Sequence, residues 1–336
     1  MATEQAKDAV EVELPEQVVI ARNALADRID AIAADYGNTL GIAVVDVQTG
    51  WTTGFNAETR LPQQSVSKLW VALTVMREVD AGAMTLDQPI TLTREDLAVF
   101  HQPIRAEILR SGSLTTDIAD LLQRALISSD NTANDAVLKA VGGPDAVRET
   151  IAALDLGDIR FGPGERLMQS EIAGLTWRQS YAFTRQGFFD ARDKVPDARR
   201  AARFRAYVDD PVDGAAPLAI ATALARLARG ELLSEASTRF LLDAMADAKS
   251  GPRRLKGGTP DGWTIAHKTG TGQYYDGRQS GYNDVALLYA PDGSAYAIAV
   301  MIGETRSGVP ANMDMMQNVT RAVAEYHEGL QVAVEP

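Results

Sequence analysis

Residues 65–76 of the chain, SVSKLWVALTVM, place a serine and a lysine three positions apart at the start of an apolar run. The run predicts a helix, and positions i and i+3 of a helix lie on one face, so the Lys68 amine can reach the Ser65 hydroxyl. A serine hydroxyl is a poor nucleophile until a neighbour takes its proton, and the start of a helix favours an alkoxide. The stretch thus predicts a nucleophilic serine that needs no histidine, with Ser67 on another face.

Two further motifs follow in order, Ser129-Asp130-Asn131 and Lys268-Thr269-Gly270. Each motif alone is a weak signal, because such short polar combinations usually cap helices or lie in solvent. Their order and context make the combination specific. Ser129 lies between two predicted helices, and Lys268 ends a predicted strand.

Around these motifs, the hydrophobic pattern predicts an α/β (α+β) fold in which strands from both ends of the chain form one antiparallel sheet flanked by helices, with an all-helical region inserted. Strands are expected at 39–47, 51–55, 263–267, 282–289 and 295–303. Helices are expected between Pro15 and Gly37 and at 68–79, 115–127, 132–141, 144–154 and 311–326. The domains we predict are a flexible tail (1–15), an α/β region (16–60 and 215–336) and a helical region (61–214).

One segment of the helical region, at about 176–209, departs from the average composition of the chain. Between Trp177 and Tyr207 it holds seven arginines and one lysine against three aspartates, interleaved with aromatic residues. Two interpretations stay open. The segment is either a pair of amphipathic helices with aromatic side chains packed inward, or a lid or partner surface beside an active site. We call it the basic aromatic segment.

Composition excludes several classes of function. The 336 residues carry 33 Lys+Arg against 45 Asp+Glu, a formal net charge of -12 that disfavours nucleic acid as a partner. The absence of cysteine removes thiolate nucleophiles, disulfides, iron–sulfur clusters and cysteine-based zinc sites. The three histidines do not pair at zinc-binding spacings, so we expect neither a metal nor another cofactor.

The apolar runs, such as 296–302, are far shorter than the roughly 20 residues that cross a bilayer, so no membrane span is expected. The first twenty residues carry acidic groups and no long apolar run, which does not fit a secretory signal. The sequence therefore leaves two possibilities, a cytoplasmic protein or one whose signal was removed.

The three motifs together resemble those of the active-site serine penicillin-recognising enzymes, and most closely the class A β-lactamases. Three longer stretches are similar to the same family: 262–272 (GWTIAHKTGTG), 283–286 (NDVA) and 128–134 (SSDNTAN). The resemblance covers residues 17–175 and 210–330, and it implies the serine β-lactamase/DD-peptidase-like fold.

The resemblance also implies roles for individual residues. Ser65 would form an acyl-enzyme with Lys68 as its proton acceptor, while Ser129 would pass a proton to the leaving lactam nitrogen under the influence of Lys268. The backbone N–H groups of Ser65 and Thr271 would form the oxyanion hole. The substrate would be bound by Asn131 at its side-chain amide and by Thr269, Gly270 and Thr271 at its carboxylate end.

Deacylation in class A enzymes uses a glutamate after the Ser-Asp-Asn helices. The resemblance points to Glu165, with Gln169 where an asparagine usually helps to hold the hydrolytic water, and Glu171 as the second choice. A glutamate that orients water beside an acyl ester is plausible general-base chemistry, although a glutamate in such a Gly- and Pro-rich loop is often merely solvated.

The chain departs from the family pattern in two places. Ser129 and Lys268 are 139 positions apart, about 35 more than the family leads us to expect, and the excess coincides with the basic aromatic segment. The ion pair that closes the family's loop would join Arg160 or Arg166 to Asp213.

The second departure is the arginine that binds the substrate carboxylate, which would be Arg306, with Arg278 as the other choice; each can equally be a solvated loop residue. Phe100 or His101 would lie at the rim of the site. His267 should point away from Lys268, because neighbouring strand residues face opposite ways, and have a structural role.

We therefore expect a serine β-lactamase with Ser65 as nucleophile and a Glu165-activated water. The alternatives are a penicillin-binding or D-Ala-D-Ala peptidase-like protein that deacylates slowly, and a non-hydrolytic β-lactam-binding domain. A related esterase fits less well, because such enzymes use tyrosine in place of Ser129. The resemblance implies a periplasmic or secreted protein, and we expect a monomer, with a dimer through the basic aromatic segment as the other option.

Overall fold

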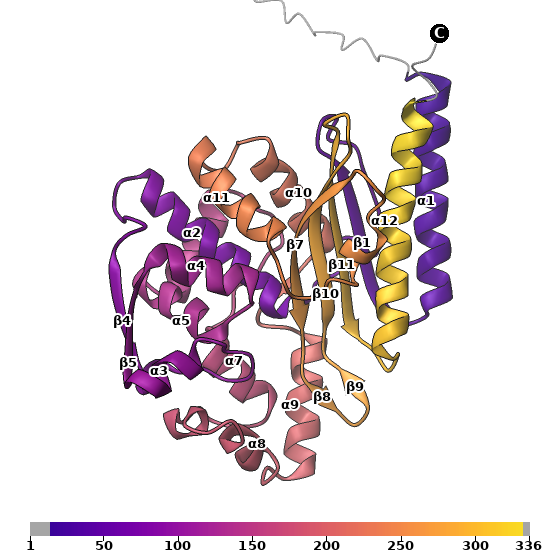
Figure 1. The fold of residues 1–336 in the computed structure, drawn as a ribbon. Coiled ribbons are helices and arrows are strands. Elements are labelled where there is room, and N and C mark those ends of the chain that lie inside the picture. The colour runs from indigo at the N-terminus through magenta and orange to yellow at the C-terminus, as the bar shows by residue number, and fades with distance from the viewer. Residues whose placement is uncertain (1–13, 332–336) are drawn as a thin grey trace, which may run out of the picture.

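The computed structural model describes residues 14–331 of the chain. Its centre is a five-stranded sheet with the order β2-β1-β11-β10-β7, in which every neighbouring pair is antiparallel (Figure 1). The strands are β1 (Thr39–Asp46), β2 (Thr52–Phe55), β7 (Thr264–Thr271), β10 (Tyr282–Tyr289) and β11 (Ala295–Glu304). Both ends of the chain contribute strands, so the predicted α/β fold with one antiparallel sheet is confirmed.

The central strands are apolar on both faces because helices cover the sheet on both sides (Figure 1). Alternate residues of a strand face opposite ways. In β11, Val300 therefore packs toward the helices of the two chain ends, whereas Met301 packs toward the helical region. The two hydrophobic clusters share the sheet as a common wall.

The first face is covered by α1 (Glu16–Tyr36) and α12 (Val309–Gln331), which lie side by side (Figure 1). Helix α1 ends where Gly37 adopts a left-handed conformation with φ 66°, and the N–H of Gly37 bonds to the carbonyl of Ala33. A glycine just after a helix commonly ends it in this way. The helix predicted between Pro15 and Gly37 is thus present.

The other face is covered by the helical region and by two helices that the sequence pattern did not predict, α10 and α11. Helix α2 lies at the centre of this region and is buried from Lys68 to Met76. The helices here are α2 (Lys68–Asp80), α3 (Arg105–Ser111), α4 (Ile118–Ile127), α5 (Asn131–Ala140), α6 (Pro144–Ala153), α7 (Glu165–Ile172), α10 (Pro217–Ala228) and α11 (Glu235–Ala246). None of the helices within residues 14–331 is long and apolar enough to cross a membrane.

Three predicted boundaries are wrong by three residues or more, and one of them is the end of the last helix, expected at 326 whereas α12 continues to Gln331. The helix expected at 115–127 starts only at Ile118, because β5 (Ser113–Asp117) pairs with β4 (Pro89–Thr93) and the hydroxyls of Thr91 and Thr115 lie 2.9 Å apart. Strand β7 does not end at Lys268 but continues to Thr271, since these residues keep pairing with β10. The tail expected over 1–15 lies outside the described residues except for its last two positions.

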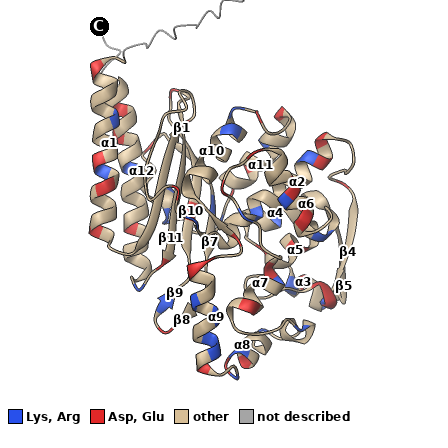
Figure 2. Cartoon of the chain, turned by 180° about the vertical axis from the view of Figure 1, so that it is seen from behind, with Lys and Arg blue, Asp and Glu red and all other residues tan. Residues whose placement is uncertain are grey.

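The basic aromatic segment folds into a 3-10 turn, η3 (Gln179–Ala182), and two helices, α8 (Gly187–Arg192) and α9 (Asp197–Asp209). It lies below α7 and beside the hairpin of β8 (Tyr274–Tyr275) and β9 (Arg278–Gln279) in Figure 1. Arginine positions recur along α9, which is blue at these residues in Figure 2, while Phe188, Phe204 and Tyr207 are buried. The aromatic side chains of the segment thus anchor it to the rest of the molecule.

Candidate active site

The predicted serine and lysine lie within hydrogen-bond distance. Ser65 is in the 3-10 turn η1 (Gln64–Ser67), which continues directly into α2, and the Nζ of Lys68 donates to the Ser65 Oγ at 3.0 Å. Lys68 is buried, and its Nζ also donates to the Asn131 Oδ1 at 2.5 Å. The Glu165 Oε1 lies 3.4 Å from the same nitrogen. The buried Lys68 nitrogen therefore lies between the serine hydroxyl and a buried carboxylate.

The second serine lies between two lysines. The Ser129 Oγ accepts from the Lys268 Nζ at 3.0 Å and from the Lys68 Nζ at 3.4 Å. Burial first, and then the nearby Lys68 ammonium, lower the pKa of Lys268 well below its ordinary value. Ser129 is itself held at a positive φ of 57° in the turn between α4 and α5. This turn brings the motif from the helical region to the edge of β7.

Glu165 is the first residue of α7, and Asp135 of α5 fixes it there. The Asp135 Oδ1 accepts from the Glu165 backbone N–H at 3.0 Å, and the Asp135 Oδ2 pairs with the Arg166 Nε at 3.2 Å. Glu165 is buried and lines the same cavity as Ser65. Glu171 instead lies on the surface and pairs with Arg203 at 3.4 Å. Of the two candidate glutamates, only Glu165 reaches the serine.

Three glutamines connect α7 to η1, the turn that holds Ser65 and is called the nucleophile turn below, and to the loop that follows β7. The Gln169 Nε2 donates to the Gln64 Oε1 at 2.9 Å and lies 3.3 Å from the Glu165 Oε2. The Gln169 Oε1 accepts from the Gln273 Nε2 at 2.9 Å. Gln64, which precedes the serine, has a φ of 54°. Sequence reasoning missed Gln64 and Gln273, because no motif marks either position.

The edge strand β7 forms one wall of the cavity through Thr269 and Thr271. Gly270 lies between them and approaches the nucleophile turn so closely that an added Cβ would be 2.2 Å from the Gln63 carbonyl oxygen. Gly270 is not among the residues that line the cavity. A side chain at this position would push β7 away from Ser65, so the glycine permits the close approach of the two elements.

The arginine beside this wall is Arg254, which sequence reasoning missed. Its Nη2 donates to the Thr271 Oγ1 at 2.5 Å and its Nη1 to the Gly270 carbonyl at 2.9 Å. The structure does not bring the two expected arginines here: Arg278 pairs with Glu304 at 3.2 Å, and exposed Arg306 pairs with Asp276 at 3.5 Å. Arg254 precedes β7 by ten residues in a loop without a recognisable motif, so only the tertiary fold reveals it.

These residues surround a cavity of about 450 Å³ that contains Ser65. Phe100 and His101 lie at its rim as expected, and Phe100 has a φ of 59°. Two residues of the basic aromatic segment, Phe189 and Arg192, also line it. His267 is fully buried outside this cavity, its Nδ1 3.0 Å from Asp284, which agrees with a structural role.

The predicted ion pair to Asp213 is absent. Arg160 pairs instead with Asp210, at 2.6 Å, and Arg166 with Asp135. Asp213 is fully buried; its Oδ2 accepts from the Gln64 backbone N–H at 2.7 Å and its Oδ1 from the Tyr207 hydroxyl at 3.0 Å. Burial raises the pKa of Asp213 to about 6. A tyrosine of the inserted helix thus takes the place expected for an arginine.

The fold thus places a serine, two lysines and a glutamate together at the junction of an antiparallel sheet and a helical region. The profile of the Beta-lactamase enzyme family matches residues 24–327. The chain therefore belongs to the β-lactamase enzyme family.

Individual relatives show which type of β-lactamase the chain is similar to. β-lactamase VEB-1 of Pseudomonas aeruginosa is 27% identical over 289 residues, which cover 86% of this chain and 85% of that protein. Extended-spectrum β-lactamase PER-1 of the same organism is 25% identical over 315 residues, which cover 93% of this chain and 90% of that protein. A crystal structure of a β-lactamase from Chitinophaga pinensis has a TM-score of 0.74 at 27% identity. The match covers 89% of this chain and 97% of that one. The chain is a hydrolase of the class A type, and its predicted family is confirmed.

Proposed function

We propose that this enzyme hydrolyses the amide bond of β-lactams through an acyl-enzyme at Ser65. The carrying observation is that Ser65 and Glu165 line one cavity and that the buried Lys68 Nζ lies between them, 3.0 Å from the Ser65 Oγ and 3.4 Å from the Glu165 Oε1. Its relatives, which carry the name β-lactamase, support the same substrate class.

In acylation, the Lys68 amine removes the proton of Ser65 as the hydroxyl oxygen attacks the lactam carbonyl. The backbone N–H groups of Ser65 and Thr271 stabilise the oxyanion that develops, a contribution of about 10²- to 10³-fold per donor in other hydrolases. Ser129 then delivers a proton to the lactam nitrogen as the C–N bond breaks, and Lys68 restores it by passing on the proton taken from Ser65 across the 3.4 Å to the Ser129 Oγ. Its hydrogen bond from the Lys268 Nζ at 3.0 Å supports this role.

Substrate binding uses the two ends of the cavity. Thr269, Thr271 and Arg254 bind the carboxylate of the bicyclic core, because a guanidinium and two hydroxyls provide charge-assisted donors at one wall. Asn131 binds the side-chain amide from the opposite wall. Asn131 also donates to the carbonyl of Val99 at 2.9 Å, which fixes it against the loop that carries Phe100.

In deacylation, Glu165 acts as the general base for a water that attacks the acyl ester. Gln169 lies 3.3 Å from the Glu165 carboxylate and orients that water from the adjacent turn of α7. Helix α7 carries both residues, so a single element sets the position of base and water.

The test is the variant Glu165→Gln, which keeps the shape of the side chain and removes the base. We expect wild-type enzyme to turn over a chromogenic cephalosporin and to show little adduct with a penicillin in intact-mass spectrometry. Glu165→Gln should accumulate a stoichiometric adduct on Ser65 and lose turnover by at least about 10²-fold, as expected for loss of a general base.

The control is Glu171→Gln, a matched change on the exposed face of the same helix, which should leave turnover unchanged. A persistent adduct on wild-type enzyme would support the slow-deacylating penicillin-binding alternative instead. A wild-type protein that forms no adduct and shows no turnover would refute the catalytic proposal and favour a binding domain.

We further propose that the enzyme acts in the periplasm or outside the cell as a monomer. The division into an α/β region (16–60 and 215–336) and a helical region (61–214) belongs to the same proposal, because the cavity lies where β7 meets η1, α5 and α7.

A further inference from the structure

The basic aromatic segment forms part of the catalytic cavity. Its Phe189 and Arg192 line the same space as Ser65 and Asn131. The ring of Phe189 lies 5.8 Å from that of Phe100, and the Arg192 guanidinium carbon lies 4.9 Å from the centre of the Phe189 ring. Phe100, Phe189 and Arg192 therefore form a continuous wall of two aromatic rings and one cation. This aromatic wall begins at the loop of Val99 and Phe100, which Asn131 contacts.

The charge of Arg192 is poorly compensated within the described residues. The only carboxylate found within 4.0 Å is that of the exposed Asp193, 3.6 Å from the Arg192 Nε. The same Nε is buried and has no hydrogen-bond partner in residues 14–331. Burial and the nearby Arg200 both lower the pKa of Arg192. Arg192 thus lines the cavity with only an exposed carboxylate near its charge.

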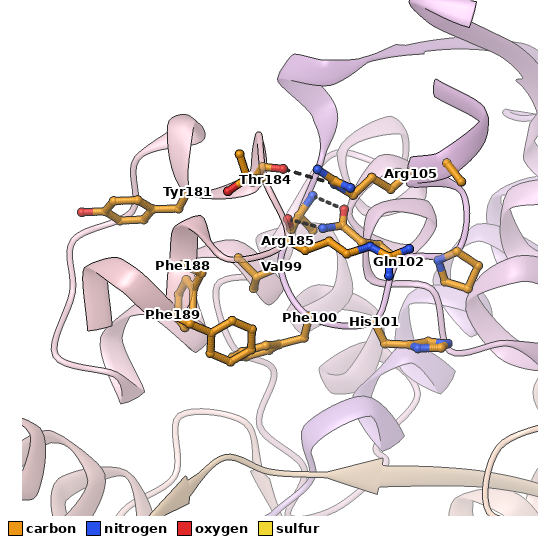
Figure 3. Close-up of a pocket in the computed structure, with 14 residues that line it drawn as sticks. Val99, Phe100, His101, Gln102, Arg105, Tyr181, Thr184, Arg185, Phe188 and Phe189 are labelled. Atoms are coloured by element: carbon orange, nitrogen blue, oxygen red, sulfur yellow. Dashed lines mark hydrogen bonds between the residues drawn. The ribbon is translucent and has the colours of Figure 1, made fainter. Parts of the chain in front are cut away.

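A second cavity, of about 530 Å³, lies behind the aromatic wall. Figure 3 shows Phe100 and Phe189 together at one end of it, and Arg105 and Arg185 toward the other. Arg105 donates to the Phe183 carbonyl at 2.9 Å, and no carboxylate lies within 4.0 Å of Arg105 or Arg185 in the described chain. The flank of the catalytic cavity formed by the segment is thus positive as well as aromatic.

We propose that Phe100, Phe189 and Arg192 form a subsite for β-lactams whose acylamino side chain carries an aryl ring and an ionised carboxylate next to it. The inference rests on the proposed β-lactam hydrolysis and adds the preferred side chain. The two phenylalanines contact the aryl ring, since aromatic pairs favour offset or edge-on contacts at about 4.5–7 Å. Arg192 binds the side-chain carboxylate through charge-assisted hydrogen bonds.

Arg254 does not serve this carboxylate. It lies at the other wall, where its guanidinium donates to Thr271, Gly270 and Asn283. The two cations of the cavity therefore match the two anionic groups of such a substrate, one on the bicyclic core and one on the side chain. This arrangement places the specificity for the side chain on the inserted segment.

The test compares three penicillins with the same phenyl ring: benzylpenicillin, its α-carboxy derivative carbenicillin and its α-amino derivative ampicillin. For each, kcat/KM is measured on wild type, Arg192→Met, Arg192→Glu and Arg185→Met. We expect Arg192→Met to lower the carbenicillin-to-benzylpenicillin ratio of kcat/KM about tenfold, the effect of losing one charge-assisted contact. Arg192→Glu should lower that ratio further and raise the ampicillin-to-benzylpenicillin ratio.

Arg185→Met is the matched control, because it removes one positive charge from the same segment but outside the catalytic cavity. It should change each ratio less than twofold. An equal effect of Arg185→Met and Arg192→Met would mean that only long-range charge acts, and would overturn the subsite. Thermal unfolding of each variant shows whether it still folds. The ratio of kcat/KM for two substrates on one variant does not depend on the fraction of that variant that is folded.

The two proposals fail in different ways. If benzylpenicillin is turned over but Arg192→Met leaves the carbenicillin ratio within twofold of wild type, the subsite is refuted and the hydrolase proposal stands. If wild type neither hydrolyses nor is acylated by any of the three penicillins, both are refuted.

Discussion

At the scale of single residues, the site depends on polar groups that are buried in matched sets. Lys68 has a relative exposure of 1% and Glu165 of 4%, and the two lie 3.4 Å apart. A buried charge is expensive unless an opposite charge and hydrogen bonds compensate it. Lys268 lacks a carboxylate at this distance among the described residues, which is why burial lowers its pKa.

Asp213 is a second buried acid, and its pKa predicts a pH dependence of stability. Its pKa of about 6 in the folded protein exceeds its ordinary value of 3.8. The folded state therefore holds the proton more tightly, and the stability contributed by this group falls as the pH rises from about 4 to about 6. Above that window the penalty is constant, on the order of 2–3 kcal/mol.

The measurement is urea unfolding of wild type and Asp213→Asn between pH 4 and pH 7. The unfolding free energy of wild type minus that of Asp213→Asn should fall by that amount over this range. A difference that does not change with pH would contradict the raised pKa. Asp145→Asn, at an exposed acid on α6, is the control and should show no such trend.

At the scale of elements, helix α9 is joined to the nucleophile turn through one side chain. The Tyr207 hydroxyl accepts from the Gln64 Nε2 at 2.6 Å and donates to the Asp213 Oδ1 at 3.0 Å. Gln64 in turn accepts from Gln169 on α7. The inserted helix thus contacts both the turn that holds Ser65 and the helix that holds Glu165.

We therefore expect Tyr207→Phe to lower stability and turnover together. Loss of the hydroxyl leaves the Asp213 Oδ1 and the Gln64 Nε2 each with one buried partner fewer, at a cost of about 1–3 kcal/mol. Because Gln64 and Gln169 then lose alignment, kcat should fall more than acylation does. Urea unfolding and pre-steady-state acylation measure the two effects.

The matched control is Tyr275→Phe, which removes a hydroxyl that bonds to Asp197 at 2.8 Å on the surface beside α9. It should change stability by less than about 0.5 kcal/mol. If Tyr207→Phe behaved like this control, α9 would be a passive cover rather than a support for the site.

Element boundaries also show where prediction from sequence reaches its limit. Residues 115–117 match a helical pattern, yet pairing with β4 makes them a strand, and Asp117 caps α4 by accepting from the Asp120 N–H at 2.8 Å. Local pattern alone does not include a partner strand more than twenty residues earlier in the chain. Strands β10 and β11, which are buried on both faces, have strong apolar runs and were predicted within one residue.

At the scale of the whole molecule, the shared sheet predicts that both hydrophobic clusters unfold together. Ile298 and Met301 of β11 are fully buried and belong to opposite clusters. We expect Ile298→Ala and Met301→Ala each to lower the free energy of unfolding by about 2–5 kcal/mol. Each variant should unfold in one transition, with far-UV circular dichroism and enzyme activity lost at the same urea concentration.

The control is Ile20→Ala, at a residue of α1 with 52% relative exposure, which should cost less than about 0.5 kcal/mol. Separate transitions in Met301→Ala, with the α1 and α12 side unfolding later, would mean that the two clusters are independent units.

The sequence by itself determined the family, the sheet of strands from both chain ends and the central catalytic candidates. These features depend on short-range signals: a serine and lysine one helical turn apart, two further motifs, and apolar runs with strand or helix period. Ser65, Lys68, Ser129 and Lys268 were named from such signals and Glu165 from the family resemblance, and the fold brings them together.

Only the tertiary structure decided which arginines face the cavity and what the inserted segment does. Arg254 and Arg192 reach the site from loops and helices distant in sequence, and Tyr207 replaces the arginine expected beside Asp213. The physical reason is that burial and charge pairing depend on which surfaces meet in space. A solvated arginine and a binding arginine have the same local sequence signal, so the packing of the chain alone distinguishes them.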